Sequence, residues 1–370
     1  MKDSEEVHKL CLRCQSLKLE QHITQRSTNE TGGISGPVAI ASSTVDNICA
    51  LCHVFDNLFA ICRQKEKARY TSLGALHQLQ DKPRSHAASN NLGLTVHHHH
   101  SEPNTSLRYF SIDSSCALEP TVRLLPLLPT PDHVLDQGID SGRVIDTAAA
   151  DLCRVKQWME LCNKTHASCI QTNPVIPPRS SVPLRIIDCT NRRVRSLEHG
   201  EAYICLSYVW GAAGRREGTD TSALPETLPK TIEDTLHVAA QLGIPQVWVD
   251  QYCIDQSNIQ EKAITIRNMD LIYGGAALTV IAAGGGCASS GLPGIRGTMR
   301  KAPRLVTVGS LQLLVSEDIG AQVRDSIWNS RGWTFQEGLL FASETHLHRV
   351  SDVLPMWRIS LYGRPESEIH

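Results

Sequence analysis

Three short apolar runs decide the fold class: YICLSYVWG at 203–211, PQVWVD at 245–250 and AALTVIAA at 276–283. They are rich in β-branched, aromatic and small apolar residues and are bounded by charged residues, glycine or proline, which is typical of buried strands. Helical patterns separate them. This alternation with short connections predicts an α/β domain on a parallel sheet with helices on both faces, in a flavodoxin-like or Rossmann-like arrangement.

The two intervening helices carry their own start and stop signals. In PKTIEDTLHVAAQLG, Thr231 is a candidate N-cap, Asp234 stands at the capping-box position and Gly243 supplies the stop. The apolar stripe of this helix comprises Ile232, Leu236, Ala239 and Leu242. A second helix is expected to open at Ser257 and Gln260. Its buried face should consist of Ile259, Ala263, Ile266, Met269 and Tyr273.

The remaining segments extend this domain on both sides. A helix is predicted over 147–163, and a short strand over 183–189. The run RLVTVGSLQLLV at 304–315 breaks the alternation, because Gly309 and Ser310 separate two alternating segments. That pattern predicts a β-hairpin inserted before the last helix.

Changes in composition indicate five parts of the chain. The order is a Cys-x-x-Cys-containing, irregular and partly disordered region at 1–119, a Pro-rich linker at 120–146, a helical lead-in with a strand at 147–200, the sheet domain at 201–345 and a tail at 346–370. The prolines of the 120–146 segment argue against a helix or a central strand and suit a linker or a packed extended arm. Four consecutive histidines at 97–100 are expected to form a solvated loop.

Composition excludes several classes of protein. The chain has 370 residues, 41% of them hydrophobic and 20% charged, which excludes complete disorder. A net charge of −2 provides no overall field for nucleic acid or an anionic membrane, so no nucleic-acid partner is expected. No apolar run reaches the roughly 18 residues of a membrane span, and no signal sequence is recognisable. A soluble, cytoplasmic protein is therefore expected.

The cysteines suggest metal binding rather than disulfides. Thirteen cysteines in a chain without a secretion signal are expected to be thiols or metal ligands. Four of them have the inner spacing of paired zinc knuckles and could hold a tetrahedral zinc, although the gap between the pairs is long: Cys11, Cys14, Cys49 and Cys52. A second candidate cluster is Cys153, Cys162, His166 and Cys169. The alternative to a metal site is that Cys162 and His166, four residues apart, simply share one face of a helix.

Unusual residues follow the predicted strands, where an open parallel sheet collects its ligands. After the first strand these are Ser207, Tyr208, Trp210 and Gly211. After the second they are Asp250, Tyr252, Cys253, Asp255 and Gln256, and after the third Gly284, Gly285 and Gly286. The structural alternative is that the tryptophans are core, Asp255 caps a helix and the glycines form a turn.

A second concentration of special residues is WNSRGWTFQEG at 328–338, with Trp328, Trp333 and Glu337 around Arg331. Trp333 and Glu337 lie one helical turn apart and would share a face. A carboxylate beside an indole is partly desolvated, which raises its pKa and suits it to general acid–base work or to stabilising a cationic intermediate. The alternative is a structural ion pair of Glu337 with Arg331 or with a lysine. No nucleophile elbow, P-loop or dinucleotide motif occurs, which argues against a serine hydrolase, a nucleoside triphosphatase and a dehydrogenase.

The blocks YICLSYVWG, VWVDQYCIDQSNIQEKAITIRNMDLIYGGAALTVIAA and WNSRGWTFQEGLL resemble, in order, the fungal heterokaryon incompatibility (HET) domain over about 203–341. The resemblance implies a role in non-self recognition, with the domain as an effector of regulated cell death after incompatible cells fuse. It also implies protein partners or self-association. The competing interpretation is a non-enzymatic, zinc-stabilised interaction scaffold.

HET domains are in turn similar to TIR domains, some of which cleave NAD through a glutamate. Leu206-Ser207-Tyr208 is similar to the TIR first-strand motif, and Asp250 falls near the second-strand acidic position. The block from Trp333 to Glu337, which includes Gln336, resembles the tryptophan-and-glutamate motif. The resemblance thus implies Glu337 as the catalytic residue of an NAD glycohydrolase, or a rim that only binds a nucleotide or assembles.

The end of the chain departs from the HET pattern. After GWTFQEGLLF the sequence continues as ASETHLHRVSDVLPMWRISLYGRPESEIH, without the expected arginines and apolar strand. This departure predicts loss of the final strand and is consistent with a shifted reading frame or a truncated gene model.

Overall fold

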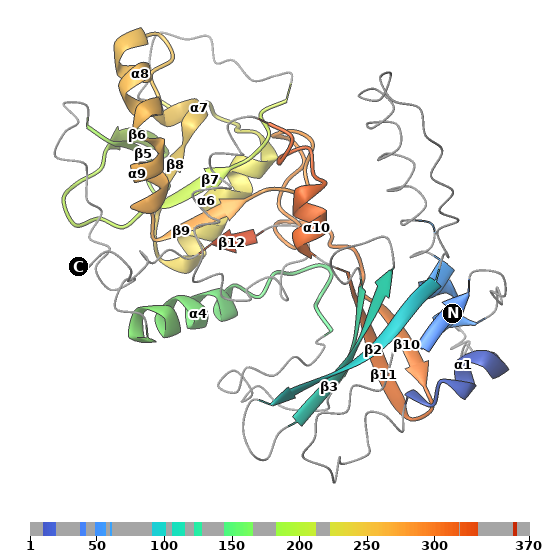
Figure 1. Ribbon diagram of the computed structural model, residues 1–370. Coiled ribbons are helices and arrows are strands. Elements are labelled where there is room, and N and C mark those ends of the chain that lie inside the picture. Colours follow the sequence, from blue (N-terminus) through green and yellow to red (C-terminus); the bar gives the residue numbers. More distant parts are fainter. Residues whose placement is uncertain are drawn as a thin grey trace, which may run out of the picture. The chain divides into compact units, whose positions relative to one another are not determined.

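The computed structural model divides the chain into two compact units (Figure 1). The first comprises residues 1–145 with 302–318, and the second comprises 146–301 with 319–370. The described residues are 10–19, 38–41, 49–56, 60, 91–100, 106–114, 122–127, 144–165, 183–211, 223–317, 319–331 and 358–360.

The second unit contains a six-stranded sheet in the order β12-β9-β7-β8-β5-β6. Its strands are β5 (Arg185–Asp188), β6 (Arg193–Ser196), β7 (Ile204–Ser207), β8 (Gln246–Val249), β9 (Leu278–Ile281) and β12 (Arg358–Ser360). As predicted, the three strands of the central runs are parallel, with β7 between β8 and β9.

The prediction of a wholly parallel sheet is wrong, because the outer strands run the other way. Strand β5 pairs antiparallel with β8 and forms a hairpin with β6, while β12 pairs antiparallel with β9. Antiparallel strands at the edge of an otherwise parallel sheet are common. The tail therefore supplies an edge strand, β12, where the sequence predicted that the final strand was lost.

Both faces of the central strands are covered. All four residues of β7 and of β9 are buried, which requires packing on both sides of the sheet. Helix α6 (Lys230–Leu242) packs against β7 and β8. In helix α9 (Met269–Gly274), the ring of Tyr273 meets that of Trp248 edge-on, with centroids 5.4 Å apart.

Helix α6 buries its predicted stripe, and Gly243 ends it at a φ of 81°. The predicted capping roles are wrong, because Pro229 occupies the N-cap position. Instead, Thr231 Oγ1 accepts a hydrogen bond from the Gly291 N–H at 3.1 Å. Asp234 Oδ2 accepts one from the Leu292 N–H at 2.9 Å. These side chains tie α6 to the loop that follows β9.

The second predicted helix is interrupted. Helix α8 (Ile259–Arg267) is capped by Asn258, whose side chain accepts from the Glu261 N–H, and α9 begins after Asn268. Helix α8 contains no buried residue, and Ile259 is 81% exposed. The expected continuous apolar face is therefore wrong for α8, although Tyr273 in α9 is buried.

The helix predicted over 147–163 lies close to its predicted position, and two short helices were not predicted. Helix α4 (Leu152–Thr165) starts after Asp151, whose side chain accepts a hydrogen bond from the Arg154 N–H at 3.1 Å, and it packs on α6. A short helix, α7 (Asp250–Cys253), follows β8 directly. Helix α10 (Ile319–Arg324) precedes the tryptophan-rich segment.

The first unit holds a second six-stranded sheet, in the order β1-β2-β3-β4-β11-β10. All neighbouring pairs are antiparallel. Its elements are α1 (Leu12–Ser16), β1 (Val38–Ala41), β2 (Asn91–His100), β3 (Ser106–Ser114), β4 (Val122–Pro126), β10 (Arg304–Val308) and β11 (Leu311–Glu317). The predicted hairpin at Gly309 is confirmed, but it completes this sheet rather than the parallel one.

Two expectations for this region are wrong. The histidines at 97–100 belong to β2 and pair with β3, so they do not form a loop. The prolines at 120–131 were expected to exclude a central strand, but this stretch contains β4, which pairs with both β3 and β11. Its prolines do not prevent this, because Pro120 lies before the strand and Pro126 ends it.

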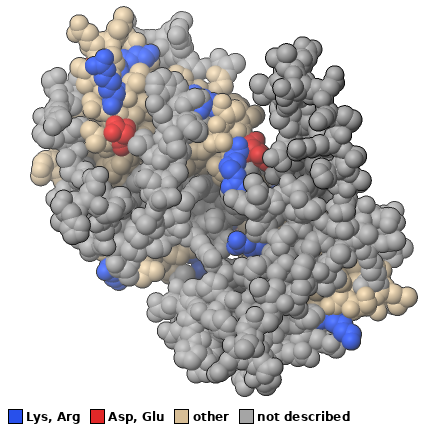
Figure 2. All heavy atoms as spheres, in the orientation of Figure 1, with Lys and Arg blue, Asp and Glu red and all other residues tan. Residues whose placement is uncertain are grey.

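Among the helices of the described residues, none combines the length and apolarity needed to cross a membrane. On the face shown in Figure 2, the Lys and Arg side chains of the described residues are scattered and form no continuous basic patch. That distribution agrees with the near-neutral charge of the sequence.

Candidate functional site

The carboxyl ends of β7 and β8 form one rim. The two strands are parallel, with Ile204 opposite Val247 and Leu206 opposite Val249. Ser207 is the last residue of β7, and Asp250 directly follows β8. The parallel register brings the loops after both strands to the same edge of the sheet, as predicted from the spacing.

A carboxylate from one loop meets an indole from the other. Trp210 Nε1 donates a hydrogen bond to Asp250, with both carboxylate oxygens 3.0 Å away. The Gln251 N–H also donates to Asp250 Oδ1 at 2.7 Å. Burial raises the pKa of Asp250 to about 6, although these two donors and the positive charge of Arg331 oppose the shift. Asp250 can therefore exchange a proton near neutral pH.

Tyr208 and Arg331 complete this rim. The Tyr208 hydroxyl donates to Gln251 Oε1 at 2.7 Å, and burial raises the pKa of the phenol. Arg331 Nη1 donates to the backbone oxygen of Tyr208 at 2.7 Å. The guanidinium thus comes close to Asp250 from a segment 81 residues further along the chain. Gln251 was not predicted as a site residue. Its position directly after β8 and Asp250 could have identified it, because the other candidates were chosen by that position.

Trp328 supports the rim from the core. Its Nε1 donates to Ser207 Oγ at 2.7 Å, and both side chains are buried. Trp328 packs in a small apolar cluster with Val209, Ile281 and Ala283. Trp328 and Ser207 therefore fix the tryptophan-rich segment onto the end of β7.

Other predicted residues lie away from this polar contact. Cys253 is buried, accepts a hydrogen bond from the Val249 N–H, and has a pKa raised to about 12 by burial, so it is a poor nucleophile. Asp255 accepts from Ser257 in an exposed turn, which lowers the pKa of its carboxyl. Gln256 follows it and is half-buried.

The loop after β9 also approaches the rim. Gly211 has a φ of 77°, and a Cβ placed there would lie 2.8 Å from Cys287 Cβ. The Ala288 N–H donates to the backbone oxygen of Trp210 at 3.4 Å. Nothing in the sequence pattern pointed to Cys287. The predicted residues Trp333, Gln336 and Glu337 lie outside the described residues.

The first predicted cysteine cluster is assembled, in the first unit. The ligand atoms of Cys11, Cys14, Cys49 and Cys52 all lie within 4.8 Å of one another. Within the described part of the chain, no other group of His, Cys, Asp and Glu side chains meets the geometry of a metal site. Of the second predicted cluster, Cys153 is exposed, while His166 and Cys169 lie outside the described residues and the side chain of Cys162 is not described.

Comparison with known proteins covers the sheet domain. Residues 203–337 match the family model described as "Heterokaryon incompatibility protein (HET)". The curated relative "Heterokaryon incompatibility protein 6, OR allele" of Neurospora crassa is 31% identical over 127 residues, which is 30% of this chain. The chain spans only 15% of that relative's length. No solved structure matches the chain.

Proposed function

We propose that the chain, whose residues 203–337 match the heterokaryon incompatibility family model, acts in fungal non-self recognition as an effector of regulated cell death. The family match carries this proposal, because it includes all three parallel strands and the whole rim where β7 and β8 end. The Neurospora crassa relative named for incompatibility supports it.

The proposed ligand-binding site is the rim at the carboxyl ends of β7 and β8. It combines a carboxylate with a pKa raised to about 6, a partly buried indole and a guanidinium, from Asp250, Trp210 and Arg331. An indole can stack on a base, and a cation favours phosphate. This combination suits a nucleotide ligand better than an apolar one.

The proposed reaction is cleavage of NAD at the nicotinamide–ribose bond. The bond breaks with both electrons leaving on neutral nicotinamide, and the ribose gains oxocarbenium character that a carboxylate stabilises. Water adds to the anomeric carbon and releases a proton, giving ADP-ribose. We assign the stabilising role to Glu337, from its resemblance to the TIR motif. The Asp250 carboxylate is suited to accept the proton from water.

The test is inducible expression of the full chain in fungal cells, with viability and NAD, nicotinamide and ADP-ribose followed over time. Glu337→Gln should abolish nicotinamide release and cell death, whereas Asp255→Asn, in an exposed turn, should leave both unchanged. Death without loss of NAD would reject cleavage and favour the second candidate, a non-enzymatic interaction protein. No death and no change in incompatibility would reject the effector function itself.

A further inference from the structure

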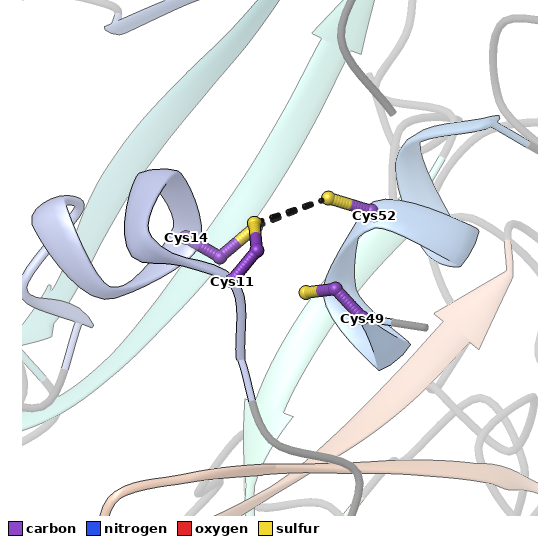
Figure 3. Close-up of side chains that lie close together, drawn as sticks. All are labelled: Cys11, Cys14, Cys49 and Cys52. Carbon is purple, nitrogen blue, oxygen red and sulfur yellow. Dashed lines mark hydrogen bonds between the residues drawn. The ribbon is translucent and has the colours of Figure 1, made fainter. Parts of the chain in front are cut away.

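Four cysteine sulfurs from two distant segments converge on one point in the first unit (Figure 3). The Sγ of Cys52 lies 3.6 Å from that of Cys11 and 3.5 Å from that of Cys14, and all four lie within 4.8 Å of one another. Sulfurs bound to one tetrahedral zinc at about 2.3 Å lie roughly 3.8 Å apart. The sulfur cage therefore has the size of a mononuclear tetrathiolate site.

Both cysteine pairs are presented by the same local structure. Cys11 is the N-cap of α1, and Cys49 precedes the helical residues 50–56, so the second cysteine of each pair lies in a first helical turn. The Gln15 N–H donates to the Cys11 oxygen at 2.9 Å, and the His53 N–H donates to the Cys49 oxygen at 3.1 Å. Two matching turns facing each other are more than the chance packing of buried thiols.

We propose that Cys11, Cys14, Cys49 and Cys52 bind one zinc ion that holds α1 and residues 50–56 on the sheet of the first unit. Four protein ligands leave no open position for water or substrate, so the role of the ion is structural. The cysteines belong to an apolar cluster with residues of both helical segments and of β4, β10 and β11. The apolar members are Leu19, Leu51, Val54, Phe55, Val122, Leu124, Val306, Val308 and Leu313. Because binding energy at such a site is folding energy, packing of this cluster should depend on zinc.

The first test is elemental analysis of the purified full chain under reducing conditions. About one zinc per chain is expected, and the double variant Cys14→Ser, Cys52→Ser should lose at least nine-tenths of it. The matched control is Cys153→Ser with Cys287→Ser, two exposed cysteines that should leave the zinc content unchanged. Iron with inorganic sulfide in place of zinc would overturn the assignment.

A second test needs no substitution and separates metal loss from misfolding. Differential alkylation with mass spectrometry should find the four cage cysteines protected until a chelator is added, while Cys153 and Cys287 react throughout. Equal reactivity before and after chelation, or disulfides among the four, would reject the site.

The structural role has its own readout. All six tryptophans lie in the second unit, so their fluorescence reports on that unit alone. Chelation should increase hydrogen exchange at residues 122–126 and 304–317 at least tenfold while leaving tryptophan fluorescence unchanged. Zinc present but no change in exchange would show that the ion does not hold the helical segments on the sheet.

Discussion

Trp210 Nε1 lies 3.0 Å from both carboxylate oxygens of Asp250, and this contact joins the loops that follow two parallel strands. The residues are 40 positions apart and meet because β7 and β8 are in register. A desolvated carboxylate with two N–H donors, from the Trp210 indole and the Gln251 backbone, is held in place but not fully compensated. That imbalance gives the rim a measurable dependence on pH.

Asp250→Asn should remove this dependence. The folded-state pKa of Asp250 is raised from 3.8 to about 6, so between these values the folded protein binds more protons than the unfolded chain. Its contribution to stability therefore falls as pH rises from about 4 to about 6, by at most about 3 kcal/mol. Asn keeps an acceptor for the indole without the charge. Denaturant unfolding followed by circular dichroism should show a flatter pH profile and a higher free energy of unfolding at pH 7.

Asp255→Asn is the matched control, because the pKa of Asp255 is shifted in the opposite direction. Hydrogen bonds from Ser257 lower the pKa of Asp255, so its charged form stabilises the folded state at neutral pH and loses that effect as pH falls through the folded pKa. The variant should be slightly less stable than the wild type at pH 7. An Asp250→Asn profile as steep as that of the wild type would contradict the role of burial.

Trp210→Phe tests the contact from the other side. The change removes the indole N–H and should raise the pKa of Asp250 further, because one of the donors that lower it is lost. A double-mutant cycle with Asp250→Asn should give a coupling energy of about 1–2 kcal/mol at pH 7. The coupling should shrink at pH 4, where the carboxyl is protonated. Because the side chain introduced by Asp250→Asn would still accept from the indole, additive effects at both pH values would show that the charge of the carboxylate adds nothing to this hydrogen bond.

The core of the fold was predictable from the sequence, but its edges were not. The runs ending at Ser207, Val249 and Ile281 were readable because full burial makes the strands continuously apolar. The antiparallel direction of β5 and the presence of β12 at the edge were not, because the pairing of the outer strands is tertiary and leaves no local pattern. Likewise, the strand at 122–126 was hidden by the prolines around it, which constrain only their own positions.

The sequence predicted which residues lie near the site, but not which of their side chains contact one another. Counting from the strand ends identified Trp210 and Asp250, because parallel strands place their carboxyl ends together. The same reasoning also selected Cys253 and Asp255. The Cys253 side chain is buried in the core, and the Asp255 side chain lies in an exposed turn. Alternation cannot resolve such a difference inside the short helix α7 and the turn after it. The assembly of the four N-terminal cysteines was suggested by their spacing alone.

Asp234→Ala should destabilise the second unit by about 3 kcal/mol. The side chain is fully buried, and Oδ2 accepts the Leu292 N–H at 2.9 Å, so truncation leaves a buried donor unpaired. Asp234→Asn keeps an acceptor and should cost less than half as much. Lys230→Ala leaves the buried carboxylate without its ion-pair partner, but Asp234 keeps the Leu292 N–H, so the loss should be smaller than for Asp234→Ala. Thermal unfolding by calorimetry checks the order; equal losses for all three would contradict it.

Gly211→Ala should cost more than its backbone conformation explains. Gly211 and Gly243 both have positive φ, at 77° and 81°, and an alanine at either costs about 1–2 kcal/mol for that reason. Only at Gly211 would the new Cβ meet a neighbour, lying 2.8 Å from Cys287 Cβ. Gly211→Ala should therefore destabilise the unit by about 3 kcal/mol, roughly twice the loss for Gly243→Ala.

Removing the opposing Cβ identifies the cause. In the Gly211→Ala background, Cys287→Gly should recover the excess and leave only the backbone cost, measured as the free energy of unfolding in denaturant. Cys287→Ala keeps the Cβ and should recover nothing. Recovery by both, or by neither, would mean that the close approach of these two loops does not limit the residue at 211. Trp210 directly precedes Gly211 in the chain. The clash in Gly211→Ala should therefore also displace the Trp210 indole and change its coupling energy with Asp250.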